Sequence, residues 1–167
     1  MKTSLSNKNR AKREQRAKAT AEIFTPPDLV NRMLDKLPPE VWQPFKTYLD
    51  PACGNGNMLL EVLRRKLHHG HDPLQALATT FGADCMADNI KECRLRLLKL
   101  VAENGHEISR AMVIEVLNNI VVTPIGKKYP RGSLDYDFQF PRKVAESDKR
   151  LDCWMHGITE RQWLESV

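Results

Sequence analysis

Residues 48–60 read Tyr-Leu-Asp-Pro-Ala-Cys-Gly-Asn-Gly-Asn-Met-Leu-Leu. A short apolar run ends in an acid, a loop with two glycines follows, and an amphipathic helix begins near Asn57. This is the layout of a ligand-binding turn at the carboxyl end of a first parallel strand. The glycines allow positive φ and close approach of the backbone to a ligand, and the helix directs its free N–H groups to the same place. The stretch therefore predicts an α/β protein with a ligand site at this turn.

A second acid follows the next expected strand. Residues 80–85, Thr-Phe-Gly-Ala-Asp-Cys, predict a strand that ends near Asp84. In dinucleotide-binding and related folds an acid at this position bonds ribose hydroxyls, because a carboxylate accepts from both hydroxyl groups. Right-handed crossovers between parallel strands bring Asp84 to the same edge of the sheet as the glycine turn.

An amphipathic helix is expected just upstream, over residues 27–37. Thr25 is a candidate N-cap, Pro26 and Pro27 suit the first helical positions, and Asp28 suits the positive end of the helix dipole. The other expected elements are a helical bridge at 41–45, strands at 46–50 and 118–123, and helices at 57–67, 73–80, 86–103 and 108–117. On the third of these helices Arg94, Arg96 and Lys99 are interpreted as a solvated face rather than a nucleic-acid patch.

Two of these segments resemble motifs of one known family. The run Asp50–Gly56 resembles motif I of the S-adenosylmethionine-dependent DNA adenine-N6 methyltransferases of the gamma order, and Phe24-Thr25-Pro26 resembles their motif X. The motifs stand in the order and at about the distance expected for that group. The resemblance implies S-adenosylmethionine as cofactor. The cofactor-binding residues that it implies are Phe24, Thr25, Pro26, Asp50, Pro51, Ala52, Cys53, Gly54, Gly56 and Asp84.

The chain departs from the family in two places. The third strand is followed by Pro124, where the family pattern carries an acid that meets the cofactor adenine. No Asp/Asn-Pro-Pro-aromatic motif is found; in the family this motif accepts the N–H bonds of the target amine and stacks on the flipped base. Residues 135–138, Asp-Tyr-Asp-Phe, have the residue types without the prolines. No catalytic residue is therefore assigned.

Positive charge is concentrated at the N-terminus. Residues 1–20 contain seven basic side chains and one acidic one, whereas the remainder carries 19 basic and 20 acidic residues. One interpretation is an arm that binds DNA phosphates, and the other is a disordered leader that adds solubility. The residues proposed to contact nucleic acid are Lys8, Arg10, Lys12, Arg13, Arg16 and Lys18.

Composition excludes several other classes. No run of apolar residues approaches a membrane span, and the basic N-terminus lacks the apolar segment of a secretory signal, so a cytoplasmic protein is expected. The four cysteines have neither zinc spacing nor disulfide-scaffold density. Cys53 and Cys85 are expected as small buried hydrophobic residues at strand ends. His68, His69 and His71 lie close together without a supporting carboxylate or thiolate, so a metal site is not favoured.

The sequence thus predicts a truncated Rossmann-like methyltransferase fold of the α/β class, with a mainly parallel sheet flanked by helices. The expected organisation is a basic disordered arm at 1–20, a cofactor-binding domain at 21–125 and a C-terminal extension at 126–167. The expected function is DNA adenine-N6 methylation or the cofactor-binding portion of that activity. The alternative is a catalytically deficient binding module that acts on DNA or on a restriction-modification partner, which would be at home in a bacteriophage genome. In the first case the base-binding element would come from another chain, a protein partner that supplies target recognition, or from an unusual sequence near Asp135–Phe140.

Overall fold

A small parallel sheet organises the computed structural model, which describes residues 24–122 together with 145 and 151. Its three strands lie in the order β1-β2-β3, and both pairings are parallel. The α/β class and the parallel sheet predicted from the sequence are confirmed. The elements are α2 (Pro27–Leu34), a 3-10 helix η1 (Pro39–Trp42), β1 (Tyr48–Asp50), α3 (Asn57–His68), α4 (Pro73–Ala78), β2 (Thr80–Asp84), α5 (Ala87–Glu103), α6 (Arg110–Asn119) and β3 (Ile120–Val122).

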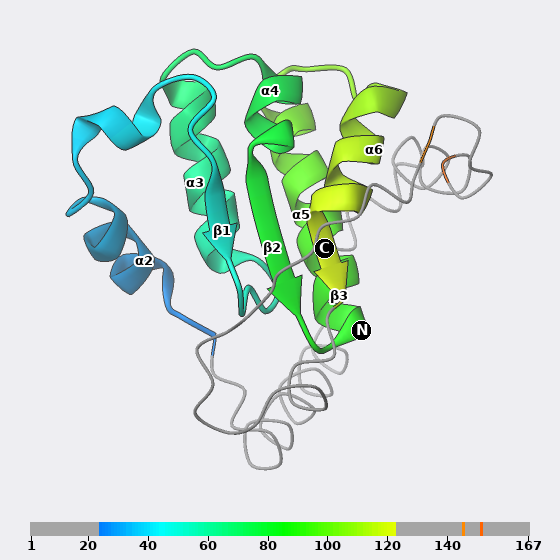
Figure 1. Ribbon diagram of the computed structural model, residues 1–167, viewed down its shortest axis with the longest axis horizontal. Coiled ribbons are helices and arrows are strands. Elements are labelled where there is room, and N and C mark those ends of the chain that lie inside the picture. Colours follow the sequence, from blue (N-terminus) through cyan, green and yellow to red (C-terminus); the bar gives the residue numbers. More distant parts are fainter. Residues whose placement is uncertain (1–23, 123–144, 146–150, 152–167) are drawn as a thin grey trace, which may run out of the picture.

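The helices that join the strands pack on one face of this sheet. In the view of Figure 1, α3 and α5 lie behind the strands, α6 lies above β3 and leads into it, and α2 lies beyond the edge of β1 that does not pair with β2. Gly82 marks the helix side, because a Cβ at this position would lie 2.5 Å from Leu59 Cδ1 of α3. A glycine in the central strand therefore lets α3 approach the sheet closely.

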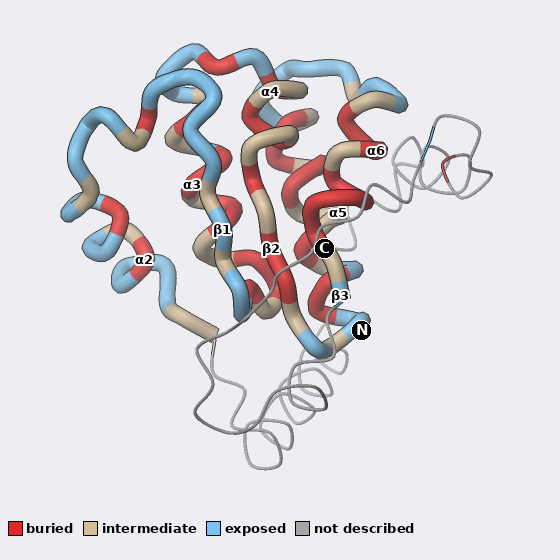
Figure 2. The backbone as a smooth tube through the Cα atoms, viewed as in Figure 1, coloured by how far each residue is buried: buried red, intermediate tan, exposed pale blue. Residues whose placement is uncertain are grey.

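Buried side chains form two clusters, visible as the red segments of Figure 2. The larger cluster lies between the sheet and helices α3 to α6, and Leu151 belongs to it with no exposed surface. The smaller one joins α2 and η1 to α3 through four buried residues, which are Val30, Leu34, Trp42 and Val62. The helix that follows the Phe24-Thr25-Pro26 segment is thus held by its own small core.

The side chain of Lys66 on α3 is buried. The hydrogen-bond partners of its Nζ within the described residues include no carboxylate. Its Nζ donates to Thr79 O at 2.9 Å, Thr79 Oγ1 at 2.8 Å and Thr80 Oγ1 at 3.1 Å. Desolvation lowers the pKa of this lysine to about 8. The ammonium group therefore joins α3 to the start of β2 at an electrostatic cost.

Side-chain caps begin two of the described helices, whereas one cap predicted from the sequence is wrong. Asp72 caps α4 by accepting from Gln75 N at 3.0 Å, and Ser109 caps α6 by accepting from Met112 N at 3.3 Å. Thr25 does not cap α2, because the N-cap position falls on Pro26 and no side chain caps this helix. The helix also ends at Leu34 rather than at residue 37. Within the described residues, no helix is long and apolar enough to cross a membrane.

Several features predicted from the sequence lie outside the described residues. These are the basic arm with Lys8, Arg10, Lys12, Arg13, Arg16 and Lys18, the segment from Thr123 through Pro124, the Asp135–Phe138 stretch and Cys153.

Candidate functional site

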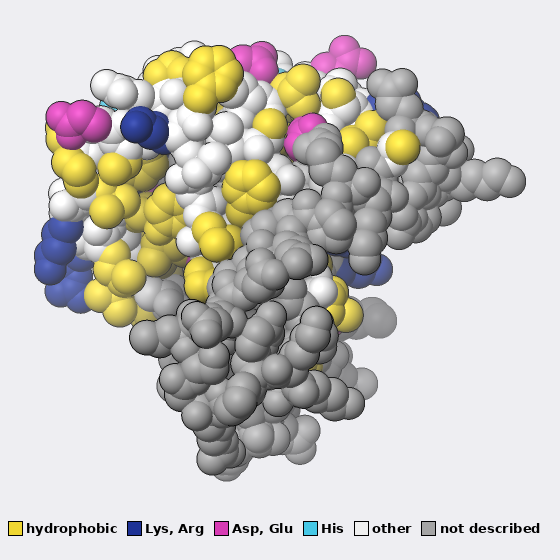
Figure 3. All heavy atoms as spheres, viewed as in Figure 1, with side chains coloured by type: hydrophobic (Ala, Val, Ile, Leu, Met, Phe, Trp, Pro, Cys, Tyr) yellow, Lys and Arg dark blue, Asp and Glu magenta, His cyan; other side chains and the backbone are white. Residues whose placement is uncertain are grey.

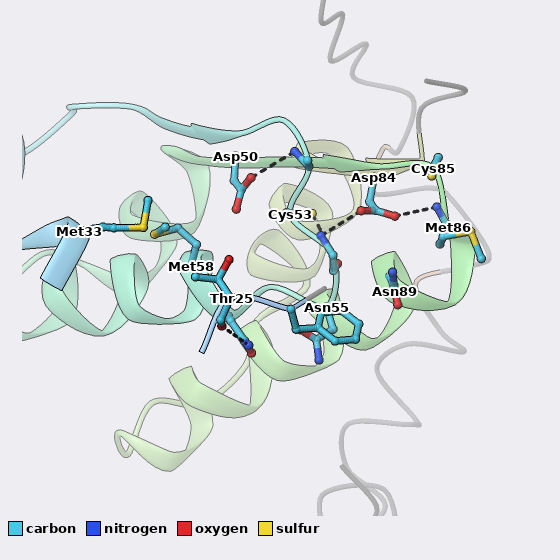
Figure 4. A pocket seen from close by; sticks show the side chains of 14 residues that line it. Thr25, Met33, Asp50, Cys53, Asn55, Met58, Asp84, Cys85, Met86 and Asn89 are labelled. Carbon is cyan, nitrogen blue, oxygen red and sulfur yellow. Dashed lines mark hydrogen bonds between the residues drawn. The ribbon is translucent and has the colours of Figure 1, made fainter. Parts of the chain in front are cut away.

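A cavity of about 470 Å³ opens at the carboxyl ends of β1 and β2. Figure 4 shows side chains from the segment before α2, from α2, from the glycine turn and from the end of β2 converging on it. Its lining residues are Phe24, Thr25, Met33, Asp50, Ala52, Cys53, Gly54, Asn55, Asn57, Met58, Asp84, Cys85, Met86 and Asn89. Three stretches that are distant in the sequence therefore form one site.

Seven of the ten residues predicted from the sequence line this cavity. Pro26, Pro51 and Gly56 do not line it. Met33 has the spacing of a residue on the buried face of its helix, and nothing in that spacing distinguishes it as a site residue. Asn57 and Met58 lie inside the quoted glycine motif, so the motif itself was the signal that could have identified them. Cys85 and Met86 follow the second acid directly, and Asn89 lies in the first turn of the helix after it.

A side chain is disfavoured at each of the two glycines of the turn, but the neighbouring group that it would meet differs. Gly54 has φ +51°, and a Cβ there would lie 3.1 Å from the ring of Phe24. Gly56 has φ +90°, and a Cβ there would lie 2.5 Å from the buried Sγ of Cys93. Gly54 therefore keeps the cavity wall close to an aromatic ring, whereas Gly56 lets the start of α3 pack on α5.

Asp84 connects the two strand ends. Its Oδ2 accepts from Gly54 N at 3.0 Å, and its Oδ1 accepts from Met86 N at 2.8 Å. The carboxylate thus fixes the glycine turn to the end of β2. Each of its oxygens still has a second lone pair for a ligand hydroxyl.

Asp50 is the second carboxylate in the cavity. Its Oδ1 accepts from Ala52 N at 3.2 Å. Burial raises the pKa of Asp50, the hydrogen bond from Ala52 opposes this rise, and the negative charge of Asp84 adds to it. Neither lysine nor arginine is among the lining residues. The described wall of the cavity therefore carries two acids and no basic side chain, so a cationic ligand would relieve their repulsion.

Arg96 on α5 joins the glycine turn to the segment before α2. Its Nη1 donates to Asn55 O at 2.7 Å and to Asn57 Oδ1 at 3.0 Å. Asn57 Nδ2 then donates to Thr25 O at 2.9 Å. The interpretation of Arg96 as part of a solvated face is therefore wrong, because its guanidinium is used within the fold.

Arg94, on the same helix, also contacts backbone rather than solvent alone. It donates from Nε to Ile120 O at 2.8 Å and from Nη2 to Leu117 O at 3.1 Å. These contacts tie α5 to α6 and β3, away from the cavity. Sequence periodicity could not reveal either role, since a helix face that points to a loop has the same spacing as one that points to water.

Asn55 lies between the cavity and a second hollow of about 460 Å³ along α3 and α5. Its Nδ2 donates to Glu92 Oε1 at 3.0 Å. Its Oδ1 is buried and has no hydrogen-bond partner. A buried acceptor without a donor is costly, so a ligand N–H or O–H at this wall would be favoured.

The cysteines divide into buried and exposed positions. Cys53 and Cys93 are buried free thiols, and their mutual hydrogen bond, followed by burial, raises the pKa of Cys53. Cys53 is thus the small buried residue that was expected. Cys85 is exposed, so the same expectation for Cys85 is wrong. It follows the last residue of β2, beyond the packed part of the sheet.

The three histidines do not form a metal site in the part of the chain that is described. No group of three or more His, Cys, Asp or Glu there could hold an ion. His71 is buried, with its Nε2 2.6 Å from Trp42 O, and His69 stacks on the Trp42 ring. Two of these side chains therefore pack the region around η1.

The fold and the cavity together define the class of protein to which the chain belongs. A glycine turn after the first parallel strand, an acid after the second and an acidic cavity between them characterise the ligand-binding half of a Rossmann-like domain. Comparison with known proteins gives the family. A family model of N-6 DNA methylases matches residues 10–158, so the chain belongs to the N-6 DNA methylase family.

One curated relative supports this assignment. The Type II methyltransferase M.VspI of Vibrio sp. (strain 343) is 31% identical over 119 residues. The match covers 68% of this chain and 27% of the relative, so the chain spans about a quarter of the length of the protein it matches. No solved structure matches the chain.

Proposed function

We propose that this chain binds S-adenosylmethionine in the cavity at Asp50 and Asp84 and serves as the cofactor-binding portion of a DNA adenine-N6 methyltransferase. The observation that carries the proposal is the charge of the cavity. Its described lining holds two carboxylates and neither lysine nor arginine. S-adenosylmethionine carries a sulfonium and an ammonium group, so this wall favours it over ligands that lack those charges. Membership of the family supports the same cofactor.

The residues offer a complementary partner for each part of the ligand. Asp84 is placed to accept from ribose hydroxyls while it holds Gly54 N and Met86 N. Asp50 is the acceptor for the ammonium group, and the glycine turn lets the backbone approach the methionine portion. Phe24 and Met58 supply apolar surface to the same cavity.

When bound, the cofactor supplies a methyl group on an electron-poor sulfur. The chain's own task is to hold the ligand in one orientation and to shield it from water, which accounts for much of the acceleration of a transfer reaction. The target amine also needs hydrogen-bond acceptors and a stacking surface. Both acids that line the described cavity are assigned to the cofactor, and no Asp/Asn-Pro-Pro-aromatic motif is found in the sequence. We therefore place the acceptor-base element, or a target-recognition partner, outside this chain's described cavity.

Calorimetry tests the binding proposal directly. The purified chain is titrated with S-adenosylmethionine and with its demethylated product, and binding of both in the micromolar range is expected. Absence of heat at millimolar ligand, from a chain that is folded by circular dichroism, would refute the assigned site. A parallel incubation with radiolabelled methyl donor and unmethylated DNA separates the two readings of function. Little incorporation agrees with a cofactor-binding portion or a catalytically deficient module, whereas robust incorporation would show a complete enzyme.

The basic arm is proposed to bind DNA phosphates. Removal of residues 1–20 takes away seven basic side chains, so it should weaken DNA binding and reduce the slope of log affinity against log salt by several units. Equal slopes for the intact and shortened chains would assign the arm to solubility alone. Melting temperatures of the two chains provide the control for folding.

A further inference from the structure

The second hollow, between α3 and α5, shares a wall with the proposed cofactor cavity. Phe24, Asn55 and Asn57 line both spaces, so these three residues form the shared wall. The face toward the viewer in Figure 3 presents mainly hydrophobic side chains over α2 and β1, whereas α3 and α5 lie behind the strands in Figure 1. The other lining residues of the hollow are Leu60, Arg64, Glu92, Arg96, Lys99, Leu100 and Glu103. The hollow thus combines an aromatic ring and two leucines with charged side chains of both signs.

The two spaces differ in the sign of their charge. The described lining of the cofactor cavity carries two carboxylates and no basic side chain, whereas that of the hollow carries three basic and two acidic side chains. Both acids of the hollow are engaged. Glu92 accepts from Asn55 at 3.0 Å, and Glu103 pairs with Lys99 at 3.8 Å. The hollow therefore suits an anionic group, which the cofactor cavity does not.

The shared wall contains an acceptor without a donor. Asn55 is 6% exposed, and its Nδ2 donates to Glu92, which fixes the orientation of the amide. Its Oδ1 is buried and has no hydrogen-bond partner among the described residues. The ring of Phe24 belongs to the same wall. An amide acceptor and an aromatic ring on one wall match a nucleobase with an exocyclic amine, because the amine donates and the base stacks.

Two basic side chains lie at a suitable distance from this wall. Arg64 stands seven residues after Asn57 on α3, which is about 10 Å along the helix axis. Its guanidinium pairs with Glu61 and has further N–H groups for another acceptor. Lys99 on α5 pairs with Glu103 over a long, partly exposed contact, so a phosphate can compete for its ammonium group. The separation is comparable with the length of a nucleotide from its base amine to its phosphate.

We propose that this hollow is a nucleotide site. It takes an adenine nucleotide with the ring along Phe24, the exocyclic amine at Asn55 Oδ1 and the phosphate at Arg64 and Lys99. Since Oδ1 is buried, a side chain of the wall shifts as the base enters. That the nucleotide belongs to DNA rests on the proposed function. An acceptor and a stacking surface are what a target amine needs, and the basic residues 1–20 lie just before Phe24 in the sequence.

Titration of the full chain with deoxyadenosine monophosphate tests the phosphate end. The demethylated product of S-adenosylmethionine is held at saturation, so that the cofactor cavity is filled, and binding is followed by NMR of the isotope-labelled chain. Arg64→Gln and Lys99→Gln should each weaken binding by up to about 5-fold, the scale of an exposed charge pair. Lys91→Gln is the matched control, because Lys91 is exposed on α5 and does not line the hollow. Glu103→Gln should strengthen binding, since it releases Lys99 and removes a negative charge.

The base contact can be tested without a mutation. The monophosphate of purine deoxyriboside lacks the exocyclic amine, so it should bind about 5-fold more weakly than the adenine nucleotide, the scale of one hydrogen bond. In Asn55→Leu the two nucleotides should bind equally. Circular dichroism and the melting temperature check that this variant folds. Deoxyadenosine and inorganic phosphate should each bind more weakly than the complete nucleotide.

Three results would overturn the proposal. They are displacement of the nucleotide by the demethylated product, equal affinities of the Lys99 and Lys91 variants, and equal binding of the nucleotide and inorganic phosphate. A chain that binds the demethylated product but not the nucleotide would reject the nucleotide site and keep the proposed function. Nucleotide binding that depends on Arg64 and Lys99, in a chain that does not bind the product, would reject the proposed function and keep the nucleotide site.

Discussion

Replacement of Arg96 by glutamine should loosen the cofactor site while the fold remains. Arg96 is a positioning residue, because it contacts the turn and Asn57 and does not line the cavity. Glutamine keeps much of the aliphatic stem but removes the charge and shortens the reach. The turn then loses two charge-assisted hydrogen bonds, and Asn57 loses the group that orients it toward Thr25.

The size of the effect follows from these two bonds. Hydrogen bonds to a charged group contribute about 1.5–3 kcal/mol, and part of this is regained from water at a half-buried site. A net loss of about 2 kcal/mol in the ordering of the turn lowers the population that can bind by at most about 30-fold, a limit reached when the turn of the parent protein is only marginally ordered. The dissociation constant for S-adenosylmethionine, measured by calorimetry, should rise by up to this factor.

The matched control is Arg94→Gln. Arg94 also donates two hydrogen bonds from α5, but its acceptors are the backbone carbonyls of Leu117 and Ile120. The two variants should therefore lose similar thermal stability, while only the Arg96 variant loses affinity. Arg96→Lys should restore part of the affinity, since an ammonium group reaches one of the two acceptors. Equal affinities for the two glutamine variants would refute a positioning role for Arg96.

Three further perturbations have different expected outcomes. Gly54→Ala should weaken cofactor binding with a small change in melting temperature, because the new Cβ meets the side-chain ring of Phe24. Gly56→Ala should lower the melting temperature itself, because the new Cβ meets buried Cys93. A larger loss of melting temperature in the Gly54 variant than in the Gly56 variant would contradict this packing. Asp84→Asn should reduce both the affinity for S-adenosylmethionine, measured by calorimetry, and the free energy of unfolding, measured in urea. Each loss should be about 1.5–3 kcal/mol, the scale of a charge-assisted hydrogen bond. An unchanged affinity would restrict Asp84 to a structural role. Because the pKa of Lys66 is lowered in the folded protein, the unfolded chain binds more protons between about pH 8 and pH 10.5. The free energy of unfolding should therefore rise with pH across that window, by up to about 1.4 kcal/mol per pH unit. This rise should be missing in Lys66→Met, and an equal dependence of the free energy of unfolding on pH in the two proteins would contradict the prediction.

Local sequence signals predicted much of the fold because they act over a few residues. The glycine turn, the strand acids and the helix start at Asn57 depend on backbone conformations that few residues allow, and the structure places them together at one end of the sheet. Helix and strand ends were less predictable. The apolar spacing of the first helix continues to residue 37, yet α2 ends at Leu34, since Leu37 packs on the smaller core from outside the helix.

The parts of the site that sequence could not predict depend on tertiary contacts. In the sequence, Arg96 is not distinguished from other charged residues on a helix face, because its function depends on a tertiary contact with the glycine turn. Met33 has the spacing of a core residue, and only the position of α2 relative to β1 turns it toward the cavity. Asn55 stands between the two glycines of the turn, where its residue type does not indicate that its oxygen is buried.

The separation of the two buried clusters has a consequence for opening motions. The smaller cluster of four buried residues attaches α2 and η1 to α3, and Arg65 reinforces it through bonds to Asn31 and Asp35. Few buried contacts and a partly exposed ion pair give a low free energy of local unfolding. This unit can therefore detach as a cooperative unit while the larger cluster stays intact. Amide hydrogen exchange should be faster in α2 than in α5, and each opening uncovers the wall of the cavity formed by Phe24 and Thr25, which provides a route by which a ligand enters and leaves.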